Sequence, residues 1–343
     1  MRLPTERSHF SSWPQSPGVS VGLIANPFPG RCGNIRRDRR VVLKVAGLSL
    51  LLPLVRIAAT VDEAPAIAHE TVVVPSGALR LKAFLWRPKG TGPFPVVLFS
   101  HGSGSVDSAH TGPIAMTEAA EKLGPIFVKH GYAFLYLFRR GQGLSADQGP
   151  FMQDVLQSEE TARGKEARQH LAFVLMTTDH LDDVLAGLRF LKSLPSIDSH
   201  RMAMAGHSFG GQLTLLAAER DSSVRAAITF GAAAASWKNS SAVRERLLAA
   251  VRKTNSPIML VHAANDYSTV PGKIMAEELD KLGRPHLLKF IRQWAKPRMM
   301  DTILSIRLSV DGKMTFSNSS INNSDDVNWP VAKRMAIQIQ GCG

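Results

Sequence analysis

Two stretches of the sequence, Val96–Phe99 and Ala133–Phe138, are uninterrupted runs of apolar residues. A strand with one face in water alternates apolar and polar residues, whereas a strand buried on both faces does not. Strands of the second kind need a layer of helices on each side of their sheet. These two runs therefore constrain the fold more than any other feature of the chain.

Between Thr71 and about residue 290, further strand and helix patterns alternate along the sequence. Strands are expected at 72–74, 79–86, 201–205, 226–230, 257–261 and 286–290, and helices at 115–130, 158–176, 178–191 and 211–219. The first two strands are expected to pair antiparallel, and right-handed crossovers join the others. The sequence thus predicts an α/β fold of three layers, in which a mostly parallel central sheet carries helices on both faces.

The formal charge of +13 raises the question of a nucleic-acid or membrane partner. Residues 1–60 hold nine Lys or Arg against two Asp or Glu, and residues 290–343 hold seven against four. Most of the excess lies in the two ends of the chain, whereas a basic binding face would concentrate it on the folded domain. We expect no nucleic-acid partner and no stable membrane insertion.

The two cysteines, Cys32 and Cys342, also lie near the ends. A domain without cysteine has no disulfide framework, no thiolate zinc site and no cysteine nucleophile.

The first forty residues show no helical or strand period, and a basic stretch, the apolar run 45–55 and small residues follow, as in a secretory signal. The run is too short to span a bilayer comfortably. We expect a disordered leader over 1–66 and export of the protein, with a cytoplasmic leader as the alternative.

The sequence Gly206-His207-Ser208-Phe209-Gly210 stands directly between an expected strand and an expected helix. A G-x-S-x-G motif in this setting is typical of a nucleophile elbow, a turn so tight that the serine takes strained backbone angles. We predict that Ser208 is the attacking nucleophile; the alternative is an ordinary glycine-rich turn. His207 is expected to point away from the serine and to be a packing residue.

A serine nucleophile needs a base and an acid that orients the base, and in this architecture their order along the chain is Ser, acid, His. Asp266 follows the strand at 257–261 and is the predicted acid; otherwise it caps a loop. The loop Ser100–Gly104 also follows a strand, and its backbone N–H groups are expected to bind the oxyanion together with the N–H of Phe209. Ser103 is the predicted donor there, and a tight turn without a catalytic role is the alternative.

Residues 70–289, about two thirds of the chain, resemble the dienelactone hydrolase-like branch of the α/β-hydrolases, near the prolyl-oligopeptidase-type esterases. The matching pieces are His101–Gly104, Arg140–Ser145, Gly206–Gly211, and Asn265-Asp266 followed by Val270-Pro271. The resemblance implies a hydrolase of carboxylic esters, lactones or thioesters that needs no metal or other cofactor. The chain departs from the family at its C-terminus and between Ser145 and Asp179, where a lid-like segment is expected at about 147–177.

The resemblance calls for a catalytic histidine after the last strand, but the only histidine after Asp266 is His286, at the start of that strand. In a shifted reading frame, Met299-Met300-Asp301 permits Asp-Gly followed by His or Tyr, which resembles the family's histidine loop. We hypothesise that the frame slips near residues 288–293. The domain would then span 67–291, and 292–343 would be an aberrant tail without the final helix.

Together these features predict a serine carboxylic-ester hydrolase that forms an acyl-enzyme on Ser208 and is impaired by the loss of its histidine. Its partner would be a small ester-type substrate. One alternative is a peptidase of the prolyl-oligopeptidase type, although no large extra domain is visible in the sequence. The other is a binding protein that kept the α/β-hydrolase fold and lost catalysis.

Overall fold

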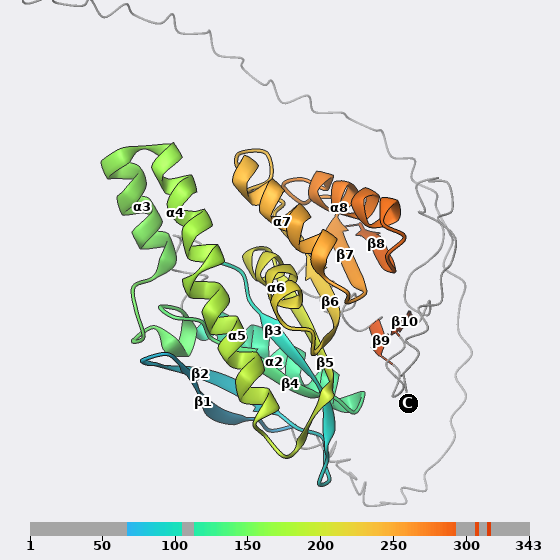
Figure 1. Ribbon diagram of the computed structural model, residues 1–343. Coiled ribbons are helices and arrows are strands. Elements are labelled where there is room, and N and C mark those ends of the chain that lie inside the picture. The colour runs from blue at the N-terminus through green and yellow to red at the C-terminus, as the bar shows by residue number, and fades with distance from the viewer. Residues whose placement is uncertain (1–66, 105–112, 293–305, 309–313, 317–343) are drawn as a thin grey trace, which may run out of the picture. The chain divides into compact units, whose positions relative to one another are not determined.

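The computed structural model describes residues 67–104, 113–292, 306–308 and 314–316. Its main sheet has eight strands in the spatial order β1-β2-β4-β3-β5-β6-β7-β8 (Figure 1). They are β1 (Glu70–Ser76), β2 (Leu79–Trp86), β3 (Phe94–Ser100), β4 (Ala133–Leu137), β5 (Ile197–His207), β6 (Val224–Phe230), β7 (Ile258–Ala263) and β8 (His286–Ile291). β2 pairs antiparallel with β1 and β4, and the other neighbouring strands pair parallel. The predicted mostly parallel sheet is confirmed.

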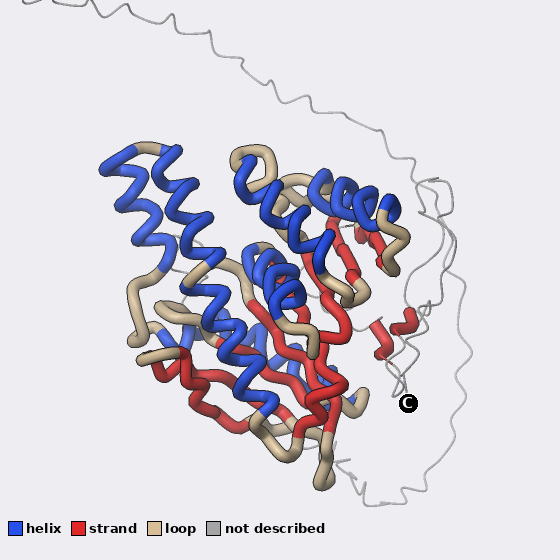
Figure 2. Tube along the Cα trace, viewed as in Figure 1, coloured by secondary structure: helices blue, strands red, loops and turns tan. Residues whose placement is uncertain are grey.

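Helices connect the strands and cover the sheet (Figure 2). They are α2 (Pro113–Lys129), α3 (Met152–Arg163), α4 (Lys165–Thr177), α5 (Asp179–Lys192), α6 (Phe209–Arg220), α7 (Ser241–Lys253) and α8 (Val270–Lys281), with a short 3-10 turn at Gly143–Ser145. Buried side chains of α5, α6, α7 and α8 belong to one core, and those of α2 belong to a second core rich in aromatic rings. The helices therefore form two layers with the sheet between them.

The first apolar run shows why its residues form a strand buried on both faces. Val96 and Leu98 in β3 lie in the core with α5 and α6, whereas Val97 and Phe99 lie in the core with α2. Successive side chains of a strand point to opposite faces, so an unbroken run supplies both cores at once. This arrangement confirms the three-layer prediction and places the strand's carboxyl end, Ser100, at the edge where loops meet.

The segment expected to be one helix over 158–176 is instead a hairpin of two helices, α3 and α4, so that prediction is wrong. Gly164 separates them with φ 88° and ψ −179°, a conformation that favours glycine and ends the helix. Arg168 in α4 pairs with Glu160 in α3 at 3.1 Å across the turn. The hairpin lies within the expected lid-like segment.

The last strand, β8, is covered less than the strands before it. Its residues are half-buried and Phe290 is exposed, whereas every residue of β7 is buried. Among the described residues no helix follows β8; β9 (Ile306–Leu308) and β10 (Met314–Phe316) form a separate antiparallel pair. The expected leader over 1–66 and the rest of the tail from 293 onward lie outside the described residues.

Candidate active site

Ser208 stands between the end of β5 and the first residue of α6, with φ 53° and ψ −115°. Positive φ is strained for any residue with a side chain, and such strain gathers at functional sites. Its backbone N–H donates to the carbonyl of Phe230 at the end of β6, with N and O 2.7 Å apart. The turn that carries Ser208 is therefore tied to the neighbouring strand.

The flanking glycines make this turn possible. A Cβ at Gly206 would lie 2.3 Å from the Gly210 carbonyl oxygen, and a Cβ at Gly210 would lie 1.9 Å from the Ser100 carbonyl oxygen. Real Cβ atoms do not approach backbone so closely, because the atoms would overlap. The first turn of α6 consequently rests directly on the end of β3.

The loop after β3 lies against Ser208. A Cβ at Gly102 would lie 3.8 Å from the Cβ of Ser208. Phe209, which follows the serine, is the first residue of α6, and the first N–H groups of a helix have no partner within the helix. The structure thus brings the loop that holds Ser103 and the start of the helix that holds Phe209 next to Ser208.

Asp266 follows β7 and lies beside the end of β6. Its Oδ2 would be 2.9 Å from a Cβ at Gly231, the residue after Phe230. Since the Ser208 N–H bonds to Phe230, the carboxylate and the serine flank the same strand end. Asp266 accepts hydrogen bonds from the Tyr267 N–H at 3.0 Å and pairs with His262 Nδ1 at 3.1 Å.

Two histidines near Asp266 differ in their surroundings. His262 is fully buried on β7, and a Cβ at Gly272 of α8 would lie 2.8 Å from its Nε2, so this nitrogen faces the helix layer. His207 lies against the loop after β3, since a Cβ at Gly102 would be 3.4 Å from its Nδ1. Burial lowers the pKa of His207, and the Asp266 carboxylate offsets part of this effect. Sequence reasoning had not identified the pairing of His262 with the predicted acid.

His286 does not approach the serine. It pairs with Ile258 at the start of β7, while Ser208 follows the end of β5, and the two strands run in the same direction. His286 therefore lies near the amino ends of the parallel strands, whereas Ser208 lies at their carboxyl ends. Its Nδ1 contacts the Arg284 carbonyl at 3.0 Å. This geometry agrees with the sequence analysis, which placed His286 at the start of the last strand and not after it.

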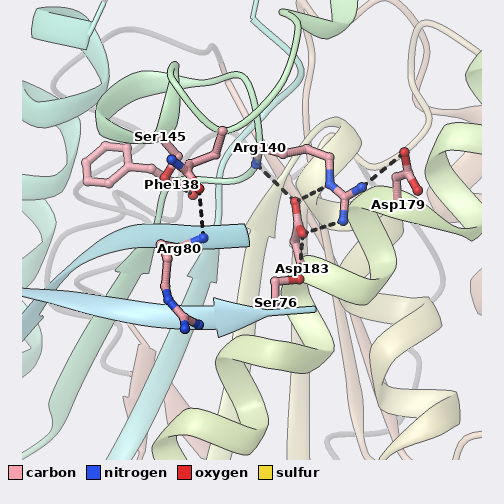
Figure 3. A network of polar contacts seen from close by, with 8 residues as sticks. Ser76, Arg80, Phe138, Arg140, Ser145, Asp179 and Asp183 are labelled. Atoms are coloured by element: carbon pink, nitrogen blue, oxygen red, sulfur yellow. Dashed lines mark hydrogen bonds and ion pairs between the residues drawn. The ribbon is translucent and has the colours of Figure 1, made fainter. Parts of the chain in front are cut away.

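The loop after β4 carries two arginines with different partners. Arg140 pairs with the buried carboxylate of Asp183 at 2.8 Å and with Asp179 at 3.1 Å, and Ser76 donates to the same Asp183 at 2.9 Å (Figure 3). These contacts tie the loop to α5 and β1. Arg139, which sequence reasoning passed over, is fully buried under the loop after β3. A charged residue at the end of an apolar strand was the available signal.

The lid-like segment reaches the same edge of the sheet. A Cβ at Gly104, the last residue of the loop after β3, would lie 3.1 Å from the ring of Phe151, which precedes α3.

In the part of the chain that the structure describes, no group of three or more His, Cys, Asp or Glu side chains is arranged to hold a metal ion. No helix within the described ranges is long and apolar enough to cross a membrane.

Comparisons with known proteins agree with this geometry. The model of the X-Pro dipeptidyl-peptidase family (S15 family) matches residues 76–276, more than half of the chain. No curated protein matches the chain significantly. Two solved structures with a TM-score of 0.50 are the acylaminoacyl peptidase of Pyrococcus horikoshii, at 18% identity, and the esterase Est22, at 17% identity.

These structures share the fold but differ in length. The alignment with the Pyrococcus peptidase covers 71% of this chain and 41% of that one, so this chain matches less than half of the larger protein. The alignment with Est22 covers 70% and 80%, respectively. A putative dienelactone hydrolase from Klebsiella pneumoniae aligns at 17% identity with a TM-score of 0.47, over 66% of this chain and 86% of that one. The predicted α/β-hydrolase fold is confirmed.

Proposed function

The chain belongs to the X-Pro dipeptidyl-peptidase (S15) family and is a serine hydrolase of the α/β-hydrolase fold, and we propose that it acts on small carboxylic esters through Ser208. The observation that carries the proposal is the strained Ser208 conformation with the loop after β3 directly against it. At an ordinary turn, a backbone strained in this way would lower the stability of the fold and serve no function.

In the proposed reaction the Ser208 Oγ attacks the ester carbonyl carbon, and the carbonyl oxygen becomes an oxyanion. The N–H groups of Ser103 and Phe209 donate to that oxygen. The C–O bond to the leaving group then breaks, the proton of the serine hydroxyl passes to the departing alcohol or to water, and an acyl group remains on Ser208. Water attacks this acyl group and releases the carboxylic acid, so that Ser208 regains its proton. Asp266 is the acid that would orient a base.

The base limits the reaction in this chain. The sequence contains no histidine after His286, which lies at the far edge of the sheet. Loss of a triad base lowers turnover by up to about 10⁶-fold, although an oxyanion hole and substrate binding alone still accelerate hydrolysis by about 10³–10⁴ over water. We expect slow turnover that rests on the oxyanion hole.

The missing base also favours esters over peptides as substrates. An amine leaving group must receive a proton, which the triad histidine donates, whereas a p-nitrophenolate leaves without one. A second candidate is cleavage of X-Pro peptides, which the description of the matching family supports. Comparing p-nitrophenyl acetate with an X-Pro p-nitroanilide separates the two, since ester turnover without anilide turnover is expected.

The nucleophile is tested by mapping the acyl group. After incubation of the full chain with p-nitrophenyl acetate, peptide mass spectrometry should find an acetyl group on Ser208. It should be absent from Ser208→Ala and unchanged in Ser222→Ala, a matched change at an exposed serine. Acetylation spread over surface residues and absent from Ser208 would contradict the proposal and favour a non-catalytic binding domain.

A further inference from the structure

Arg139 follows β4 as a fully buried cation with no part in the mechanism above. Burying a charge is costly unless it is paired or hydrogen-bonded, so such a residue needs an explanation. The described hydrogen bonds of its guanidinium go to neutral oxygens. These acceptors are Ser100 Oγ at 2.9 Å, the His101 and Gly102 carbonyls at 2.8 Å each, and Gln142 Oε1 at 3.2 Å. Apart from Gln142, all belong to the end of β3 and the loop that follows it.

These contacts fix the direction of the loop's peptide groups. Arg139 holds the carbonyls of His101 and Gly102, and Gln142 Nε2 donates to the next carbonyl, that of Ser103, at 2.8 Å. In a trans peptide the C=O and the following N–H point in opposite directions, and no cis peptide is found in this loop. The N–H groups of Gly102 and Ser103 therefore point away from the guanidinium, and that of Gly104 points away from the Gln142 amide.

Successive backbone N–H groups on one side of a loop form a concave site for an anion. The predicted oxyanion donor, the Ser103 N–H, is the middle one of this set. Ser208 lies against the same loop, as the 3.8 Å between its Cβ and a Cβ at Gly102 shows. Arg139 thus orients a set of N–H groups in the loop that lies against Ser208, where a tetrahedral intermediate would form.

Arg139 also contacts the residue that supplies the second donor. Its guanidinium carbon lies 5.6 Å from the centroid of the Phe209 ring, a cation–π distance. The ring of His180 packs edge-on against Phe209 with centroids 5.5 Å apart. The side chain of Phe209, whose N–H opens α6, is therefore held in place by Arg139 and His180.

We propose that Arg139 is a positioning residue of the oxyanion hole: it orients the Gly102–Ser103 peptide and the Phe209 ring, and its charge favours the oxyanion. The inference rests on the proposed function, because the hole matters only if Ser208 forms a tetrahedral intermediate. Burial lowers the pKa of Arg139 to about 10, and the negative charge of Asp183 offsets part of this effect. The side chain therefore stays protonated at neutral pH. In a buried site such a charge is weakly screened.

The test compares Arg139→Lys with Arg140→Lys, the same change at adjacent positions of one loop. Lysine keeps the charge but cannot donate in a fork to two carbonyls. For p-nitrophenyl acetate, Arg139→Lys should lower kcat by roughly 10²-fold, the size of losing one oxyanion donor, with KM within about threefold. Arg140→Lys should keep kcat and KM within about threefold, since Arg140 contacts α5 rather than the loop.

Two further measurements separate positioning from a general loss of structure. Gln142→Leu keeps Arg139 but releases the Ser103 carbonyl and removes one of the four oxygens that accept from the guanidinium, so a smaller fall in kcat, about tenfold, is expected. Phenylboronic acid, which forms a tetrahedral anion on the serine, should bind less tightly to Arg139→Lys in proportion to kcat. The neutral analogue phenylacetamide should bind equally to both proteins, and circular dichroism checks that each variant is folded.

The outcomes distinguish the inference from the function beneath it. If the parent chain forms neither acetyl-Ser208 nor a boronate adduct, the proposed function fails and the inference with it. If the parent reacts but folded Arg139→Lys keeps kcat and boronate affinity within about threefold, only the role of Arg139 is overturned. Equal weakening of boronate and phenylacetamide binding also overturns it, because positioning acts on the tetrahedral species alone.

Discussion

Replacing Gly210 by alanine tests whether the close approach of α6 to β3 builds the active site. The new Cβ would lie 1.9 Å from the Ser100 carbonyl oxygen and 2.4 Å from that of His101, whereas ordinary contacts begin at 3.4 Å. Both neighbours are backbone, so α6 or the loop must move by more than 1 Å. Overpacking of this kind costs about 1–3 kcal/mol, and the helix preference of alanine returns up to about 1 kcal/mol. A displacement of about 1 Å at a reacting centre lowers the rate by roughly 10²-fold.

Gly211→Ala is the matched control, one residue further along the same helix. Its Cβ would meet the Ala232 Cβ at 3.0 Å, which a shift of a few tenths of an ångström relieves. Urea unfolding followed by tryptophan fluorescence should place this variant within about 1 kcal/mol of the parent, with acyl transfer to Ser208 retained. We expect Gly210→Ala to lose most acyl transfer while it still folds. Equal stability and equal acylation of the two variants would refute the argument from overlap.

Three further predictions concern the base, the pH dependence and a buried ion pair. Free imidazole at tens of millimolar should raise the rate of acetyl transfer to Ser208 by about 10-fold or more, because it would supply the proton acceptor that the proposed mechanism lacks, and Ser208→Ala provides the background rate. Burial, together with the charge of a neighbouring arginine, lowers the pKa of His180 to about 3, below its value of about 6.5 in the unfolded chain. Between these two pKa values the unfolded chain binds a proton that the folded chain does not. The folded chain is therefore destabilised as the pH falls below about 6.5, and the loss of stability reaches about 2 kcal/mol at about pH 5. In His180→Gln the midpoint of urea unfolding should change less with pH between about pH 7 and 5 than it does in the parent. An unchanged dependence of the midpoint on pH would contradict the assignment. Asp183→Asn removes the buried partner of Arg140 and should cost about 3 kcal/mol in urea unfolding, whereas Glu159→Gln, at a pair with an exposed arginine, should change it by less than about 1 kcal/mol.

The sheet and the elbow were predictable because their signals are local. The unbroken runs at 96–99 and 133–138 directly indicate burial on both faces, and Gly206 is needed because a Cβ there would overlap the carbonyl of Gly210, four residues along the chain. The break at Gly164 was missed because a single glycine inside a helical pattern is usually tolerated. Here it takes a positive φ, and an ion pair between the two helices fixes the turn.

The contacts that support the proposed oxyanion loop were not predictable from the sequence. Arg139 is separated from Gly102 by 37 residues, and only the parallel pairing of β3 with β4 brings their ends together. Likewise, the pairing of His262 with Asp266 depends on β7 ending where it does. Contacts of this kind come from the order of strands in the sheet, which a residue pattern does not state.

The proposed active site therefore consists of two parts that the chain supplies separately. The proposed oxyanion hole is made of backbone N–H groups, and the residues that we propose to orient it, Arg139, Gln142 and the start of α6, all precede Ile291. The base belongs, in the family that the sequence resembles, to the segment after the last strand, where the frame hypothesis places the fault. If that hypothesis holds, the encoding DNA contains a shifted frame with Gly-His beyond β8, and restoring it should raise turnover by orders of magnitude without changing the hole. Imidazole would then add nothing to the restored protein, because the histidine occupies the position that imidazole fills in this one.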